Sequence, residues 1–60
     1  MQNKAQLLDA AHGRYADAWM AAAEAEWQLA HGLCTFAQRN AARAEEQAAG
    51  RELMQLLQAA

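Results

Sequence analysis

The sequence predicts an all-α fold: an antiparallel two-helix hairpin that pairs with a second copy to form a four-helix bundle. Alanine provides 18 of the 60 residues, valine and isoleucine are absent, and Thr35 is the only β-branched residue. Ala, Leu, Gln, Glu, Arg and Met favour helices, whereas sheets are built largely from the β-branched and aromatic residues that are scarce here. Apolar residues also recur at three- and four-residue spacings, which is the helical period.

A first helix is expected over about residues 4–31. Asn3 is a good N-cap, and Gln6 three residues later completes a capping box. No capping side chain closely follows Gly13, so we expect the helix to continue through that glycine. One face of this helix carries a regular apolar series: Leu8, Ala11, Tyr15, Ala18, Trp19, Ala22, Ala25, Leu29 and Leu33. Within it, every seventh residue from Leu8 to Leu29 is apolar, the spacing of a coiled-coil seam.

A short turn is expected over about residues 32–35, followed by a second helix over about 36–58. Gly32 can adopt the left-handed conformation that ends helices, and Thr35 with Gln38 forms a second capping box. Because the connection is short, the two helices should be antiparallel. The second helix carries two apolar stripes, one of Ala37, Ala41, Ala44 and Ala48 and the other of Ala42, Ala49, Leu53 and Leu56.

Two stripes on one helix indicate two neighbours, which a single hairpin cannot supply. The chain has fourteen large apolar side chains, and its single cysteine, Cys34, excludes an internal disulfide. Chains this small usually need a staple, a metal or a partner. We therefore expect one domain over residues 1–60 that forms a homodimer. Its core or dimer interface should be drawn from Leu8, Tyr15, Leu29, Leu33, Phe36, Leu53 and Leu56.

Neither catalysis nor a cofactor is expected. His31 and Cys34 are three residues apart, but a zinc site needs four ligands, and nothing evident orients the histidine for a Cys–His nucleophile pair. A structural histidine at a helix end and a buried or half-buried cysteine are the expected roles. The closely spaced carboxylates point to different faces of their helices and form no facing pair: Glu24 with Glu26, and Glu45 with Glu46.

Charge and hydropathy bear on the class of partner and on location. The net charge is −2, from five Lys/Arg against seven Asp/Glu, whereas nucleic-acid binders usually carry a basic stripe. Arg39 and Arg43 share a helical face, with Arg14 expected nearby, so these three arginines remain an alternative site for phosphates or an acidic partner. No apolar run is long enough for a membrane span. A free thiol without an export signal indicates a cytoplasmic location.

The two tryptophans are the main candidates for a binding surface, because Trp is enriched at binding hot spots. Trp19 and Trp27 are about 80° apart around the helix. One of them could pack inside the hairpin while the other faces a second chain; the alternative is that both are ordinary core residues. Met20 and Trp27 form a second apolar strip. The expected partner-binding residues are Trp19, Met20, Trp27, Arg39 and Arg43.

Part of the chain resembles a known family of small helical proteins. Tyr15-Ala16-Asp17-Ala18, followed by Ala25, Leu29, Leu33 and then Ala37-Gln38-Arg39, is similar to the quorum-sensing anti-activators encoded by Pseudomonas phages. This resemblance implies a dimerising helical hairpin that binds host regulators or motor proteins. The segment from His31 to Leu57 also resembles small co-chaperones of type III secretion needle subunits, which are helical hairpins too.

Taken with the residues, these resemblances imply a binding module that acts through a larger host or cognate protein. The expected function is that of a non-enzymatic inhibitor or anti-activator, from a phage or a bacterium, that covers a surface its target needs. A secretion co-chaperone is one alternative. A nucleic-acid-linked transcriptional regulator that acts through Arg14, Arg39 and Arg43 is another.

Overall fold

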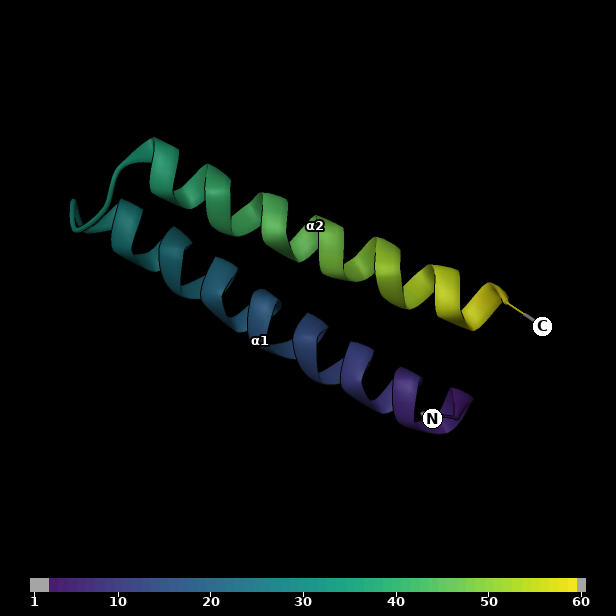
Figure 1. Cartoon of the computed structure of the whole chain (residues 1–60). Coiled ribbons are helices and arrows are strands. Elements are labelled where there is room, and N and C mark those ends of the chain that lie inside the picture. Colours follow the sequence, from purple (N-terminus) through teal and green to yellow (C-terminus); the bar gives the residue numbers. More distant parts are fainter. Residues whose placement is uncertain (1–2, 60) are drawn as a thin grey trace.

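The computed structural model describes residues 3–59, which form two antiparallel helices joined by a short turn. Helices α1 (Lys4–Ala30) and α2 (Phe36–Gln58) lie side by side along their whole length (Figure 1). The molecule is a rod 44 Å long and 14 Å across. The all-α hairpin is therefore confirmed. Its helix boundaries agree with those expected, except that α1 ends at Ala30 and His31 is its C-cap.

Both helices begin with the capping boxes that the sequence predicts. The Asn3 side chain accepts a hydrogen bond from the backbone N–H of Gln6 (2.9 Å), and the Gln6 side chain accepts one from the backbone N–H of Asn3 (3.1 Å). Thr35 and Gln38 repeat this exchange at the start of α2, at 3.1 and 2.8 Å. These bonds satisfy backbone N–H groups that have no partner within the helix.

Gly32 ends α1 in the left-handed conformation expected of it, with a φ of +71°. The Gly32 N–H donates to the Leu29 carbonyl (3.1 Å), and the Leu33 N–H donates to the Gln28 carbonyl (2.7 Å). This pair of bonds is a Schellman motif. It stops α1 and turns the chain back toward the N-cap of α2.

The glycines inside the helices differ in what they do. α1 continues through Gly13, as expected. Gly50 lies where a Cβ atom would be 3.3 Å from Cε1 of Tyr15, so the missing side chain lets the tyrosine ring pack directly on the backbone of α2. Glycine costs a helix about 1 kcal/mol relative to alanine, and this ring contact offsets that cost.

The two helices meet through small side chains. Ala11 and Ala22 are only 1% and 3% exposed, and the other buried residues in the described part of the chain are Ala25 and Leu53. Small side chains let the helix axes approach closely. Around this centre lie the half-buried residues Leu8, Tyr15, Leu29, Ala42, Ala49 and Leu56. The expected stripe of α2 that ends in Leu53 and Leu56 therefore faces α1.

Two residues expected in the core are not part of the hairpin core. Leu33 is 65% exposed and Phe36 is 67% exposed. Leu33 follows Gly32, whose left-handed backbone breaks the helical period, so Leu33 no longer continues the apolar face of α1. Phe36 is the first residue of α2 and lies about 100° around that helix from the buried Leu53. Their place in a dimer interface stays a prediction. The apolar stripe of α2 that does not face α1 is also exposed in the single hairpin: Ala37, Ala41, Ala44 and Ala48.

Candidate functional site

Both tryptophans lie on the surface of the hairpin. Trp19 is 55% exposed and Trp27 is 54% exposed, so the expectation that one packs inside the hairpin is wrong, as is the alternative that both are core. The buried Ala22 marks the side of α1 that faces α2. At about 100° per residue, Trp19 lies about 60° from Ala22 and Trp27 about 140° from it. The alanines occupy the helix contact, and the indoles are left outside it.

Trp27 and Met20 form the outer face of α1, on the side away from α2. Met20 is 62% exposed and lies about 160° around the helix from Ala22. The indole of Trp27 stacks on the imidazole of His31, with ring centroids 4.1 Å apart and planes 25° apart. The Trp27 carbonyl oxygen also accepts a hydrogen bond from Nδ1 of His31 (2.8 Å). One face of the Trp27 ring is therefore in contact with His31 within the chain itself.

Trp19 belongs to a different surface. It lines a small depression of about 160 Å³ together with Arg43 and Glu26. The structure therefore brings together Trp19 and Arg43, two of the expected partner-binding residues. It places Met20 and Trp27 elsewhere, on the outer face.

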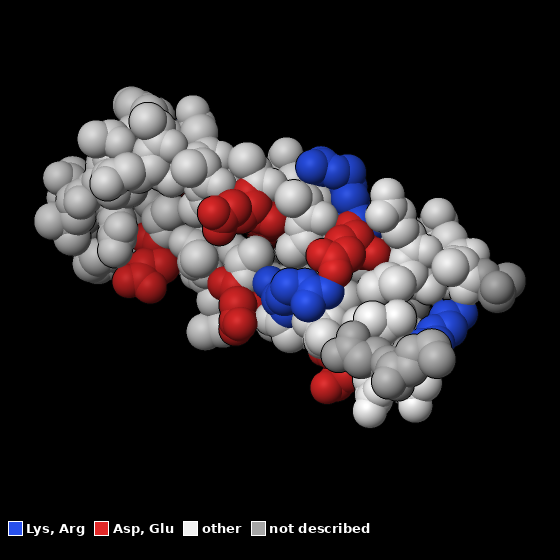
Figure 2. Space-filling model, in the orientation of Figure 1, with Lys and Arg blue, Asp and Glu red and all other residues white. Residues whose placement is uncertain are grey.

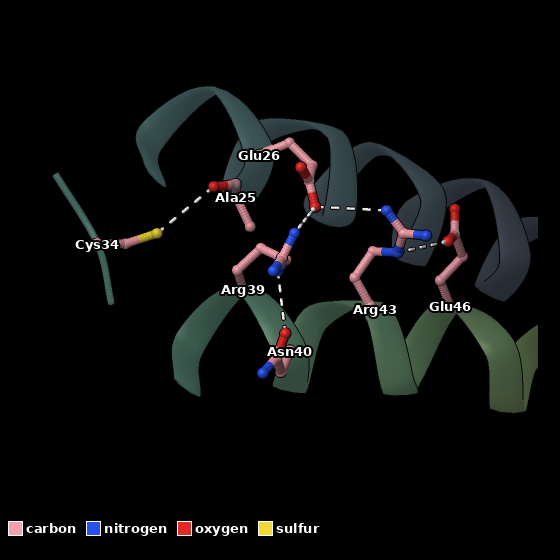
Figure 3. A network of polar contacts seen from close by, with 7 residues as sticks. All are labelled: Ala25, Glu26, Cys34, Arg39, Asn40, Arg43 and Glu46. Carbon is pink, nitrogen blue, oxygen red and sulfur yellow. Dashed lines mark hydrogen bonds and ion pairs between the residues drawn. The ribbon is translucent and has the colours of Figure 1, made fainter. Parts of the chain in front are cut away.

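Arg39 and Arg43 are held by a carboxylate of the other helix (Figure 3). Glu26 on α1 accepts hydrogen bonds from Nη1 of Arg39 (2.9 Å) and from Nη1 of Arg43 (3.3 Å). Arg43 also pairs with Glu46 on its own helix, at 3.9 Å. The Arg39 guanidinium lies 5.7 Å from the centroid of the Phe36 ring. This network joins the helices near the turn and occupies both arginines.

The Arg39 hydrogen bond is the main reason that the pKa of Glu26 lies below its ordinary value of 4.5. Partial burial opposes this shift, and the positive charges of Arg39 and Arg43, with the Arg43 hydrogen bond, reinforce it. A carboxylate with a lowered pKa in the folded state stabilises that state fully above its unfolded pKa. The stabilisation is lost as the pH falls through the folded pKa.

We expect Glu26→Gln to remove the part of the pH dependence of folding stability that comes from this carboxylate. The variant should be less stable than the wild type at neutral pH and should lose less stability on acidification below pH 4.5. Urea denaturation at a series of pH values measures both effects. Glu24→Gln is the matched control, because Glu24 accepts its hydrogen bond from Gln28 on the same helix. An unchanged pH dependence in Glu26→Gln would show that the cross-helix ion pairs do not stabilise the fold.

Arg14 does not join the other two arginines. It forms an ion pair with Glu52 of α2, and Glu52 lies nine residues beyond Arg43, a rise of about 13 Å along the helix. Acidic and basic side chains are interleaved on the face shown in Figure 2, where the turn end is largely uncharged. The expected cluster of three arginines is therefore not formed.

His31 and Cys34 have separate partners. The Cys34 thiol is half-buried and donates to the Ala25 carbonyl at 3.4 Å, as Figure 3 shows, whereas His31 stacks on Trp27. Of the buried and half-buried states expected for this cysteine, the structure shows the half-buried one. Among residues 3–59, no group of three or more His, Cys, Asp or Glu side chains is arranged to hold a metal ion. Neither helix in the described part of the chain is both long and apolar enough to cross a bilayer.

Sequence reasoning missed an apolar hollow beside Tyr15. The hollow has a volume of about 540 Å³, and its lining includes Tyr15, Gly50, Leu53 and Met54. The sequence feature that could have indicated this hollow is Gly50, because glycine is unusual inside a helix of otherwise strong helix formers. From the sequence one predicts only that this glycine lowers the stability of its helix. The ring packed against it comes from the other helix, so the contact itself could not be predicted.

Comparisons of the chain with protein-family models, with curated proteins and with solved structures found no match. The resemblances to phage anti-activators and secretion co-chaperones thus rest on the residues quoted for them. What they imply about partners stays a prediction.

Proposed function

We propose that this chain is a small non-enzymatic protein-binding module, from a phage or a bacterium, that inhibits a larger bacterial protein by covering a surface which that protein needs. One observation carries the proposal: Trp27 and Met20 project from the outer face of α1 and are 54% and 62% exposed. The partner is a larger host or cognate protein, and the chain acts as a homodimer in the cytoplasm.

The form of the outer face supports a protein partner. Exposed Ala16 and Ala23 lie beside Met20 and Trp27 on this face, so small side chains leave one edge of both large apolar groups uncovered. Protruding aromatic residues that fill pockets are typical of binding hot spots. The His31 stack reduces the ordering that Trp27 needs on binding, which favours affinity.

The arginines favour a protein partner over nucleic acid. Arg14, Arg39 and Arg43 each form an ion pair with a carboxylate of the other helix, so phosphate groups would have to displace those carboxylates. A net charge of −2 also opposes approach to a polyanion.

We expect Trp27→Ala to weaken target binding at least about tenfold, the loss typical of a hot-spot residue, while the thermal melt stays unchanged. Trp27 lies outside the helix–helix contact, so its removal creates no cavity there. The target is the protein that the wild type retains from a bacterial lysate and Trp27→Ala does not, identified by mass spectrometry. Its affinity is then measured by calorimetry with both purified proteins.

Trp27→Phe is the matched variant and should retain more affinity than Trp27→Ala, because it keeps an aromatic ring against His31. Two results would contradict the proposal: unchanged binding of every retained protein by Trp27→Ala, or unfolding of that variant. Binding to a DNA duplex that weakens steeply as salt rises would instead support the nucleic-acid alternative.

A further inference from the structure

One flank of the hairpin carries large apolar side chains from both helices. The close approach of Gly50 to the Tyr15 ring places these two residues on the same flank. Trp19 follows Tyr15 by one turn, and Met54 and Leu57 follow Gly50 by one and two turns, so they continue along the same side. We call Tyr15, Trp19, Gly50, Met54 and Leu57 the apolar flank. Trp19, Met54 and Leu57 are each more than half exposed.

The apolar flank is also hollowed. The space of about 540 Å³ beside Tyr15 lies on it, with Leu53 and Met54 among its lining residues. A hollow of this kind admits large side chains from another molecule. Its lining also includes Arg51, Gln55 and Gln58, whose side chains are exposed and long enough to keep their polar ends in water when an apolar group enters.

The opposite flank is polar. It carries the ion pair between Arg14 and Glu52, and the hollow beside it is lined in part by Asp17, Ala21 and Glu45. Hydrated charges of this kind stabilise a surface that faces water. The two flanks therefore differ in what can cover them, and only the apolar flank gains by being covered.

The accessible surface area of the chain favours a permanent partner over a transient one. The chain exposes 4538 Å², whereas a compact monomer of 6.6 kDa exposes about 3,900 Å². The excess of about 600 Å² is close to the roughly 800 Å² that each partner loses in an interface of standard size. This excess is present whenever the chain is folded. A second copy of the chain is always present where the chain is made, so it can cover this area permanently.

We infer that a second copy of this chain covers the apolar flank, and that the two copies run antiparallel about a two-fold axis. The inference rests on the homodimer of the proposed function and defines its interface. It also separates the two tryptophans: Trp19 lies in the dimer contact, and Trp27 remains free for the target.

The antiparallel arrangement follows from where the apolar residues lie along α2. Phe36 precedes Gly50 by fourteen residues, two heptads, and so lies on the same flank. Phe36 and Leu57 are about 17 and 15 Å from the middle of α2, in opposite directions. A two-fold axis across the middle therefore places Phe36 of each copy against Leu57 of the other. Trp19, about 3 Å from the middle of α1, lies near the axis.

The charged residues on this flank do not oppose the contact. Glu26 already accepts hydrogen bonds from Arg39 and Arg43 within its own chain. Covering the edge of a paired group avoids the large penalty of burying an unpaired charge. The second copy therefore meets ion-paired side chains at Glu26, Arg39 and Arg43, and the exposed Arg51 beside the hollow can keep its guanidinium in water.

Sedimentation equilibrium of a matched pair of variants tests the interface. The wild type should have a mass about twice 6.6 kDa. Trp19→Glu should raise the dimer dissociation constant about 30-fold or more, whereas Trp27→Glu, a change on the same helix at equal exposure, should leave it within about twofold. A monomeric wild type, or equal dissociation of both variants, would overturn the inference. Because Trp27→Glu separately tests target binding, loss of the dimer and loss of the target are told apart.

Cysteine cross-linking tests the arrangement without requiring a destabilised variant. In a Cys34→Ser background, chains with Phe36→Cys and chains with Leu57→Cys are mixed and oxidised. Disulfides between the two kinds of chain should predominate, because a disulfide requires Cα atoms within about 7 Å. Ala21→Cys and Glu45→Cys, on the polar flank, should stay unlinked. Predominant links between chains of the same kind, or equal linking on the polar flank, would overturn the antiparallel contact.

Discussion

Leu53→Ala should lower the free energy of unfolding by about 2–5 kcal/mol, the range for truncating a buried leucine. Leu53 is 9% exposed, and the other buried residues described are alanines. Among the described residues, Leu53 is therefore the one buried side chain larger than alanine, and the buried alanines are too small to fill the space left behind. Urea denaturation followed by circular dichroism, at one fixed protein concentration, measures the change.

The matched control is Leu33→Ala, the same change at a leucine that is 65% exposed in the turn. It should alter the free energy of unfolding by less than about 0.5 kcal/mol. Equal effects of the two substitutions would mean that Leu53 does not anchor the contact between α1 and α2.

Ala22→Leu should destabilise the hairpin by about 3 kcal/mol, at the upper end of the range for overpacking. Ala22 is 3% exposed at the place where α1 meets α2. A leucine there adds three carbon atoms where the structure has room for one methyl group, so the helices must separate along much of their length. Thermal and urea denaturation should both show the loss.

Ala16→Leu is the control for this substitution. Ala16 is exposed on the same helix and lies about 120° around it from Ala22. Because both alanine and leucine favour helices, this change should be nearly neutral. If Ala22→Leu were as stable as Ala16→Leu, the close approach of the helices would not depend on small side chains.

The local features of the fold could be predicted from the sequence because they depend on neighbours three or four residues away. Asn3 with Gln6 and Thr35 with Gln38 form their capping boxes within one turn. Gly32 stops α1 through bonds to the turn just before it. The periodic alanines likewise identify which side of each helix is apolar. None of these features requires knowledge of the other helix.

The candidate site was less predictable because it depends on pairs of residues far apart in the chain. Glu26 meets Arg39 and Arg43 only when the hairpin closes. Spacing along one helix therefore predicted that Arg39 and Arg43 share a face, but it could not predict that Glu26 of the other helix pairs with both. The tryptophans were misplaced for a related reason: periodicity grouped Trp19 with the apolar face but could not say how wide a strip α2 covers.

Composition, caps and periodicity by themselves determined two antiparallel helices of nearly the observed lengths, since each depends on hydrogen bonds and side chains within one or two turns. Only the tertiary structure decided how each helix is rotated about its own axis. That rotation follows from the closest packing of Ala11, Ala22 and Ala25 against the stripe of Leu53, and from the Tyr15 ring seated on Gly50. It buries methyl groups and leaves both indoles outside, because the narrow contact between the helices has no room for them.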